Sequence, residues 1–254
     1  MAGLRVSQRV RLHEAAITTV EELAVSGGPV PGIGAKTLER LRHQARLQSA
    51  QDARPLLAGE RPDVVAEVVD PAPLIGLPTP NPGDLFFDFE GDPLWDCGDQ
   101  HVGLEYLFGV VEADTGEFRA LLAHDRQQEK QALEDFLAYV QRRREEHPEL
   151  RIYHYASYER SALARLAARH SVGEDVVDDL FRHGVLVDLY ATVRATVRVS
   201  QPSYSIKKLE PLYMGDDLRS PGSPSPSRCR AAPRCARGWP VGLGAGVCLC
   251  PVRP

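Results

Sequence analysis

This sequence of 254 residues shows few of the features that mark membrane proteins, secreted proteins or cysteine-rich metal-binding proteins. No stretch reaches the about 18 to 20 consecutive apolar residues of a membrane span, and the N-terminus lacks the order of residues typical of a signal peptide. Only five cysteines occur, and they lack the paired Cys-x-x-Cys spacing of a zinc site. We therefore expect a cytoplasmic protein without a membrane segment or a disulfide framework.

Charge is unevenly distributed along the chain. No acidic residue follows Asp217, whereas six arginines do, so residues 1–217 hold 24 basic and 35 acidic residues and a net charge of −11. This excess of acids argues against a broad basic surface for nucleic acid, although a local basic patch or a bound metal ion would still be compatible with such a partner.

In residues 1–50 the apolar residues recur at helical spacing, and Thr18 or Thr19 is placed to cap a helix, so the pattern predicts helices there. The Gly-Ile-Gly at residues 32–34 separates two such segments and resembles the helix-hairpin-helix motif. In that motif backbone N–H groups bind a DNA phosphate, which makes Gly32, Gly34 and Lys36 candidate nucleic-acid-binding residues. An ordinary helical hairpin with glycine as the breaker fits the same letters.

The rest of the chain divides by composition. Residues 51–83 contain seven prolines and predict a linker, and residues 84–217 predict an α/β domain. Residues 185–198 and 205–213 are more ambiguous, and we expect a strand edge or turn followed by helical pieces. We expect strands at residues 84–93, 104–111, 117–123 and 151–155, and helices at residues 126–146 and 158–169. This order predicts an antiparallel meander continued by a strand parallel to the first.

Two acids stand out inside the apolar run of residues 84–93. Asp88 and Glu90 are two positions apart, so in a strand they project from the same face. A strand with one solvated face would show the same alternation, but Phe86 and its neighbours make the run apolar on both faces, which predicts a buried central strand. Because no Lys or Arg occurs from residue 63 to residue 118, a divalent cation is the natural partner for these acids.

The pair resembles the first motif of the DEDD exonuclease superfamily, in which Asp-x-Glu on the first strand binds the catalytic metals. Residues 154–159, His-Tyr-Ala-Ser-Tyr-Glu, have the spacing of the second motif, His-Asn-x-x-Phe-Asp, with Glu159 in place of the aspartate. Residues 84–216 look like the YprB-type ribonuclease H-like domain of RecB-like nucleases. The resemblance implies a ribonuclease H-like mixed sheet flanked by helices, preceded by a small all-α helical hairpin.

The same resemblance implies a metal-dependent nuclease with 3′–5′ exonuclease-like activity on DNA, in preference to RNA. Asp88, Glu90 and Glu159 would hold two Mg²⁺ or Mn²⁺ ions that activate water and stabilise the leaving oxygen. Lys207 and Lys208, at the start of a Lys-Leu helix segment, are further candidates for binding nucleic acid. Nuclease or helicase portions outside this chain are expected partners.

Three further polar residues near these motifs have weaker functional readings. His154 is a tempting general base, but the base of this superfamily usually lies near its last motif, so we expect His154 to be structural. Asp92 and Asp188 are expected in supporting or turn positions.

The sequence departs from the superfamily at its C-terminal end. The last motif should supply a fourth carboxylate on a helix, and only Asp216 and Asp217 are available as substitutes. Residues 218–254 are rich in proline, glycine and arginine without periodicity and predict a disordered low-complexity tail. This abrupt change suggests a domain that is truncated or read out of frame at its C-terminal end. The alternatives are therefore a catalytically impaired fragment that binds nucleic acid or assembles with a partner, and a purely structural fragment.

Overall fold

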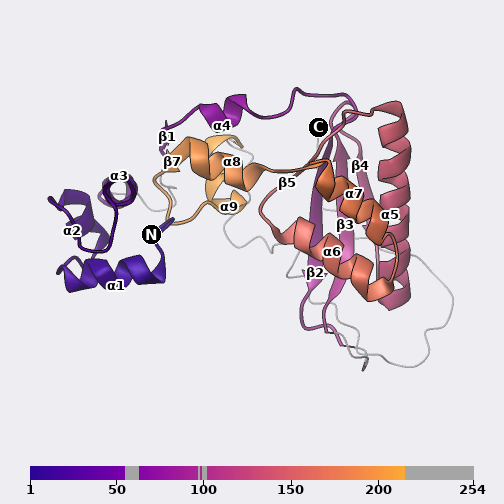
Figure 1. Ribbon diagram of the computed structural model, residues 1–254, viewed down its shortest axis with the longest axis horizontal. Coiled ribbons are helices and arrows are strands. Elements are labelled where there is room, and N and C mark those ends of the chain that lie inside the picture. The colour runs from indigo at the N-terminus through magenta and orange to yellow at the C-terminus, as the bar shows by residue number, and fades with distance from the viewer. Residues whose placement is uncertain (55–62, 97, 99–101, 215–254) are drawn as a thin grey trace.

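The computed structural model describes residues 1–54, 63–96, 98 and 102–214, and Figure 1 shows a helical unit at one end and a sheet with helices at the other. A small sheet with short helices lies between these two parts. Since residues 215–254 fall outside the described ranges, the predicted disordered tail and the substitutes Asp216 and Asp217 do so too. None of the helices in the described ranges is long and apolar enough to cross a membrane.

The N-terminal unit contains the predicted helices, as α1 (Val6–Glu14), α2 (Val20–Val25) and α3 (Ala35–Asp52). Thr19 caps α2, because its side chain accepts a hydrogen bond from Glu22 N at 3.1 Å while the Glu22 carboxylate accepts one from Thr19 N at 3.0 Å. A small apolar core holds the three helices together: Leu12, Leu23, Val30, Ile33, Leu38, Leu41 and Ala45.

The larger sheet has the predicted topology. Its strands are β2 (Leu85–Asp92), β3 (Leu104–Glu112), β4 (Phe118–Leu122), β5 (Ile152–His154) and β6 (Leu186–Asp188), in the spatial order β4-β3-β2-β5-β6. The pairs β2–β3 and β3–β4 are antiparallel, whereas β5 is parallel to both β2 and β6. This mixed sheet flanked by helices, with further helices before it, confirms the predicted fold class.

One face of the sheet packs against helices. Leu85, Phe87 and Phe89 of β2 lie in a single core with residues of α5 (Arg126–Glu146), α6 (Tyr158–His170) and α7 (Glu174–Arg182). The Phe87 ring stacks on Phe136 of α5 with 4.4 Å between the ring centroids. Because side chains alternate along a strand, this packing directs the other residues of β2 to the opposite face.

The prediction that β2 is buried on both faces is wrong for the described part of the chain. Phe86 is 47 % exposed and Phe118 of β4 is 58 % exposed, and both lie on the face that α5, α6 and α7 leave open. The apolar side chains on the second face of β2 are therefore not covered by helices of the described part of the chain. Phe86 instead stacks on Tyr153 of β5, with ring centroids 5.7 Å apart.

The segment predicted as a linker contributes to the small sheet between the two ends. Within residues 51–83 lie β1 (Ala66–Val68), which pairs antiparallel with β7 (Val197–Val199), and the short helix α4 (Ala72–Ile75). The same middle part contains α8 (Leu189–Thr196) and α9 (Ile206–Leu209), which follow β6 in a region expected to mix strand and helix, and a short 3-10 turn (Glu210–Leu212).

We predict that the one-sided core carries most of the stability of the sheet. Phe136→Ala should lower the free energy of unfolding by about 3 to 5 kcal/mol, because it leaves a cavity beside Phe87. Phe118→Ala removes the same side chain from the open face and should cost less than about 1 kcal/mol. Urea unfolding of both variants measures the difference, and equal losses would show that Phe118 is buried in solution.

Candidate active site

The candidate residues lie where parallel strands end together. Since β2, β5 and β6 run in the same direction, their carboxyl ends lie at one edge of the sheet, which is where open α/β sheets bind ligands. Asp88 lies at the middle of β2 and Glu90 in its second half, and His154 and Asp188 are the last residues of β5 and β6. Glu159 lies in the first turn of α6, shortly after β5.

The structure brings Asp88 and Glu159 together. Their carboxyl groups are within hydrogen-bonding reach, and Glu90 adds a third negative charge nearby. Although Asp88 keeps some contact with solvent, partial burial of its carboxyl group and the charge of Glu159 raise its pKa to about 6. The pair therefore keeps a proton in mildly acidic solution and loses it as the pH rises through about 6.

Glu159 has an oxygen that lacks a donor. Its side chain is only 4 % exposed, and Oε2 has no hydrogen-bond partner among the described residues. The ring nitrogen His154 Nδ1 lies 3.3 Å away, but it is only 2.6 Å from Ala156 O. Because a carbonyl oxygen can only accept, Nδ1 donates there, and the buried Oε2 is left with the lone pairs that an oxygen-binding cation needs.

The loop that leads to Glu159 is held by Asp188. Asp188 Oδ1 accepts hydrogen bonds from Ala156 N at 3.0 Å and from Tyr190 N at 2.9 Å, and Ala156 has a positive φ of 81°. His154, buried at the end of β5, holds the same loop through Ala156 O. Both residues thus position the loop, as the sequence analysis expected. Asp92 likewise serves a turn, since its Oδ1 accepts from Leu94 N at 2.9 Å.

Sequence reasoning missed the role of Glu105 in β3. This buried carboxylate accepts a hydrogen bond from Tyr158 Oη at 2.7 Å and contacts Arg165, so it anchors the first turns of α6. A Cβ at Gly91 would lie 2.3 Å from Glu105 Oε2, so a larger residue there would require the Glu105 carboxylate to move. The sequence signal for this contact was Gly91, directly after the Asp-Phe-Glu run, because a glycine inside a strand often marks a bulge or a close approach. The register of β2 and β3 does shift between Glu90 and Gly91.

The other candidates do not join this edge. Gly32, with φ +79°, and Gly34, the N-cap of α3, lie in the N-terminal unit with the exposed Lys36. Lys207 and Lys208 are exposed on α9. Across the described ranges, no three His, Cys, Asp or Glu side chains gather closely enough to hold a metal ion, so Asp88, Glu90 and Glu159 do not form a complete three-ligand group.

A mixed five-stranded sheet with acids at the shared ends of its parallel strands defines a ribonuclease H-like domain. A family model described as RNase H superfamily matches residues 85–227, more than half of the chain, and the protein therefore belongs to this superfamily. Searches of curated proteins and of solved structures found no match. Membership supports a nuclease-like function in general, which implies nucleic-acid binding, and nucleases of this type usually use divalent metals.

The raised pKa of Asp88 predicts a pH-dependent stability. An acid whose pKa is higher in the folded than in the unfolded state stabilises the fold fully below about pH 4, and this contribution is lost as the pH rises through about 6. Asp88→Asn cannot ionise and should escape this loss. Its melting temperature in EDTA, relative to that of the wild type, should therefore be higher at about pH 7 than at about pH 4.

Glu117→Gln is the matched control, because it removes a carboxyl group from an exposed turn before β4. This variant should follow the wild type at both pH values. If Asp88→Asn also runs parallel to the wild type, the carboxyl pair does not hold a proton in the folded protein.

Proposed function

We propose that this protein is a metal-dependent nuclease that hydrolyses phosphodiester bonds of DNA, and RNA less readily, in the manner of a 3′–5′ exonuclease. The observation that carries the proposal is the meeting of Asp88 with Glu159, whose buried Oε2 lacks a donor, at the shared end of parallel strands in an RNase H superfamily domain. The likeness of residues 84–216 to the YprB-type domain of RecB-like nucleases supports the polarity and the preference for DNA.

Asp88 and Glu159 would hold Mg²⁺ or Mn²⁺, with Glu90 close enough to add negative charge. Both ions prefer carboxylate oxygens, and bound at such a site they lower the pKa of a water molecule and stabilise the leaving oxygen of a phosphodiester. For this the Asp88–Glu159 pair must release its proton, so cation affinity should increase as the pH rises towards about 6. His154 and Asp188 keep the loop before Glu159 in place.

The resemblance also supports a setting for this activity. We place the protein in the cytoplasm, where it would act with nuclease or helicase portions outside this chain. The two glycines and Lys36 of the helical hairpin, with Lys207 and Lys208, are the proposed contacts to the nucleic-acid backbone.

A second candidate is a domain that binds nucleic acid without cutting it. The observation in its favour is that the described residues supply two close carboxylates and no complete three-ligand group. The sequence agrees with this alternative, since no acid follows Asp217 to provide a fourth ligand.

Cleavage of 5′-labelled single-stranded DNA in the presence of Mn²⁺ separates the two candidates. The wild-type chain should shorten the strand stepwise from its 3′ end, and EDTA should stop the reaction. Asp88→Asn and Glu159→Gln should each lower the rate at least about 100-fold, because a lost metal ligand costs more than the about 10- to 100-fold of an outer-sphere partner.

Glu117→Gln should cut at the wild-type rate. Binding of DNA without shortening would favour the second candidate, and shortening that survives Asp88→Asn would show that the active carboxylates lie elsewhere. Parallel reactions on single-stranded RNA measure the preference for DNA.

A further inference from the structure

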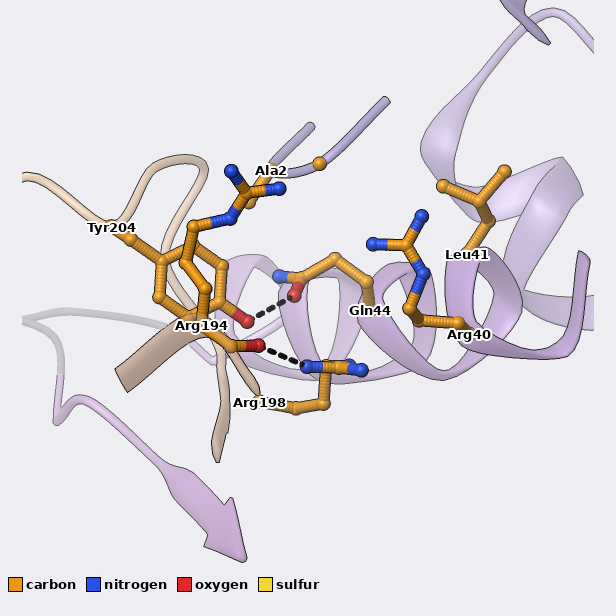
Figure 2. A pocket seen from close by; sticks show the side chains of 8 residues that line it. Ala2, Arg40, Leu41, Gln44, Arg194, Arg198 and Tyr204 are labelled. Atoms are coloured by element: carbon orange, nitrogen blue, oxygen red, sulfur yellow. Dashed lines mark hydrogen bonds between the residues drawn. The ribbon is translucent and has the colours of Figure 1, made fainter. Parts of the chain in front are cut away.

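An arginine-lined pocket lies where the N-terminal unit meets the middle part of the molecule. Arg40 of α3, Arg194 of α8 and Arg198 of β7 surround it together with Gln44 and Tyr204 (Figure 2). Figure 2 shows the three guanidinium groups around the side chain of Gln44. Three cations, one from α3 and two from the consecutive elements α8 and β7 about 150 residues further on, thus converge on one site, which we call the seam pocket.

The positive charge of the seam pocket has no counter-charge in the described part of the chain. None of the three arginines there has a carboxylate oxygen within 4.0 Å. Glu67 lies opposite Arg198 in the β1–β7 ladder, but its carboxylate is bound to His43 Nε2 at 2.7 Å. Burial, followed by the charges of Arg198 and Arg194, lowers the pKa of Arg40.

The floor of the pocket is fixed by hydrogen bonds. The Gln44 side chain, only 2 % exposed, donates to Val199 O at 2.7 Å, and Tyr204 Oη lies 3.2 Å from Gln44 Oε1. The Arg198 guanidinium donates to Arg194 O and to Val197 O, each at 3.0 Å, which leaves its remaining N–H groups for a ligand. A site held in place in this way loses little freedom when an anion binds.

Size and chemistry select the ligand. The space inside this partly open pocket is about 10 Å³, enough for one water-sized group. Guanidinium groups match the oxygens of phosphate in geometry and charge. We propose that the seam pocket binds a phosphate of a nucleic-acid backbone, with one phosphate oxygen inserted between Arg40 and Arg198. The choice of nucleic acid as the source of the phosphate rests on the proposed nuclease function.

The seam pocket is joined to the carboxylate edge by a direct contact. Tyr155, which follows His154 in the loop before Glu159, donates a hydrogen bond from its hydroxyl group to Tyr204 O. Tyr204 is buried and lines the pocket. A backbone phosphate at the seam would therefore lie beside Tyr204, which also accepts a hydrogen bond from the loop that leads to Glu159.

Binding of a fluorescein-labelled single-stranded DNA in EDTA, followed by anisotropy at several salt concentrations, tests the site without cleavage. The double variant Arg40→Gln, Arg198→Gln should bind about tenfold more weakly or worse, because charge-assisted hydrogen bonds are lost. The slope of log affinity against log salt should fall by about 0.7, the value for one phosphate contact on a single strand. Arg142 is exposed on α5, outside the pocket. Arg142→Gln removes one positive charge there and should alter neither the affinity for DNA nor the salt slope.

Thermal unfolding provides the check on folding. Removal of like charges from the pocket should leave the melting temperature unchanged or raise it, and inorganic phosphate should stabilise the wild type more than the double variant. Arg194→Gln changes an exposed residue of the pocket and should also weaken DNA binding, so the site can be tested even if the double variant does not fold.

Wild-type affinity and slope in both the double variant and Arg194→Gln would overturn the inference. An equal loss of affinity in Arg142→Gln would overturn it as well, because the arginines would then act only through net charge. Stabilisation by inorganic phosphate with unchanged DNA binding would identify an anion site that does not serve nucleic acid. Since the assay is run in EDTA and needs no catalysis, a failure of the proposed nuclease activity is distinguished from a failure of this site.

Discussion

The alternation of side chains along β2 is the constraint on which the rest of the structure depends. Leu85, Phe87 and Phe89 enter the core with α5 and α6, so the residues between them must face the other way. A shift of one residue in the pairing of β2 would expose three large apolar side chains and bury Asp88 in the core. The packing of the core and the position of the candidate site are therefore fixed by the same register.

The second consequence of this register is electrostatic. It directs Asp88 towards Glu159, and the described part of the chain has no cation placed between them. The pKa of Asp88 rises to about 6 as a result, so the pair keeps a proton in mildly acidic solution. A divalent ion can replace this proton reversibly, whereas an arginine in the same place would occupy the site permanently. An acid pair that is costly in the free protein is thus suited to binding a metal ion.

Much of the fold follows from local sequence, and the rest depends on contacts that local sequence does not record. The helix at Arg126–Glu146 and the strand and helix that carry His154 and Glu159 follow from periodicity. Asp88 was singled out by its position in an apolar strand, and Glu159 by the resemblance of residues 154–159 to a known motif. The open face of the sheet could not be predicted, because letters do not tell which face a helix will cover. The pairing of β1 with β7 joins segments about 130 residues apart within a proline-rich region. The role of Glu105 was missed because it depends on a contact with Tyr158 of α6 and on the room left beside Gly91, both of which arise only in the folded chain.

The candidate active site and the seam pocket are complementary in charge. The first brings the carboxyl groups of Asp88 and Glu159 together, and the second gathers arginines that have no carboxylate within 4.0 Å among the described residues. The fold keeps them apart on different elements and joins them through Tyr155 and Tyr204. If both proposals hold, a nucleic-acid strand with a bound divalent ion would supply a cation at Glu159 and a backbone phosphate at Arg40. Such a ligand would stabilise each site by neutralising the repulsion between its like charges. The relief of this repulsion would then contribute to the binding free energy.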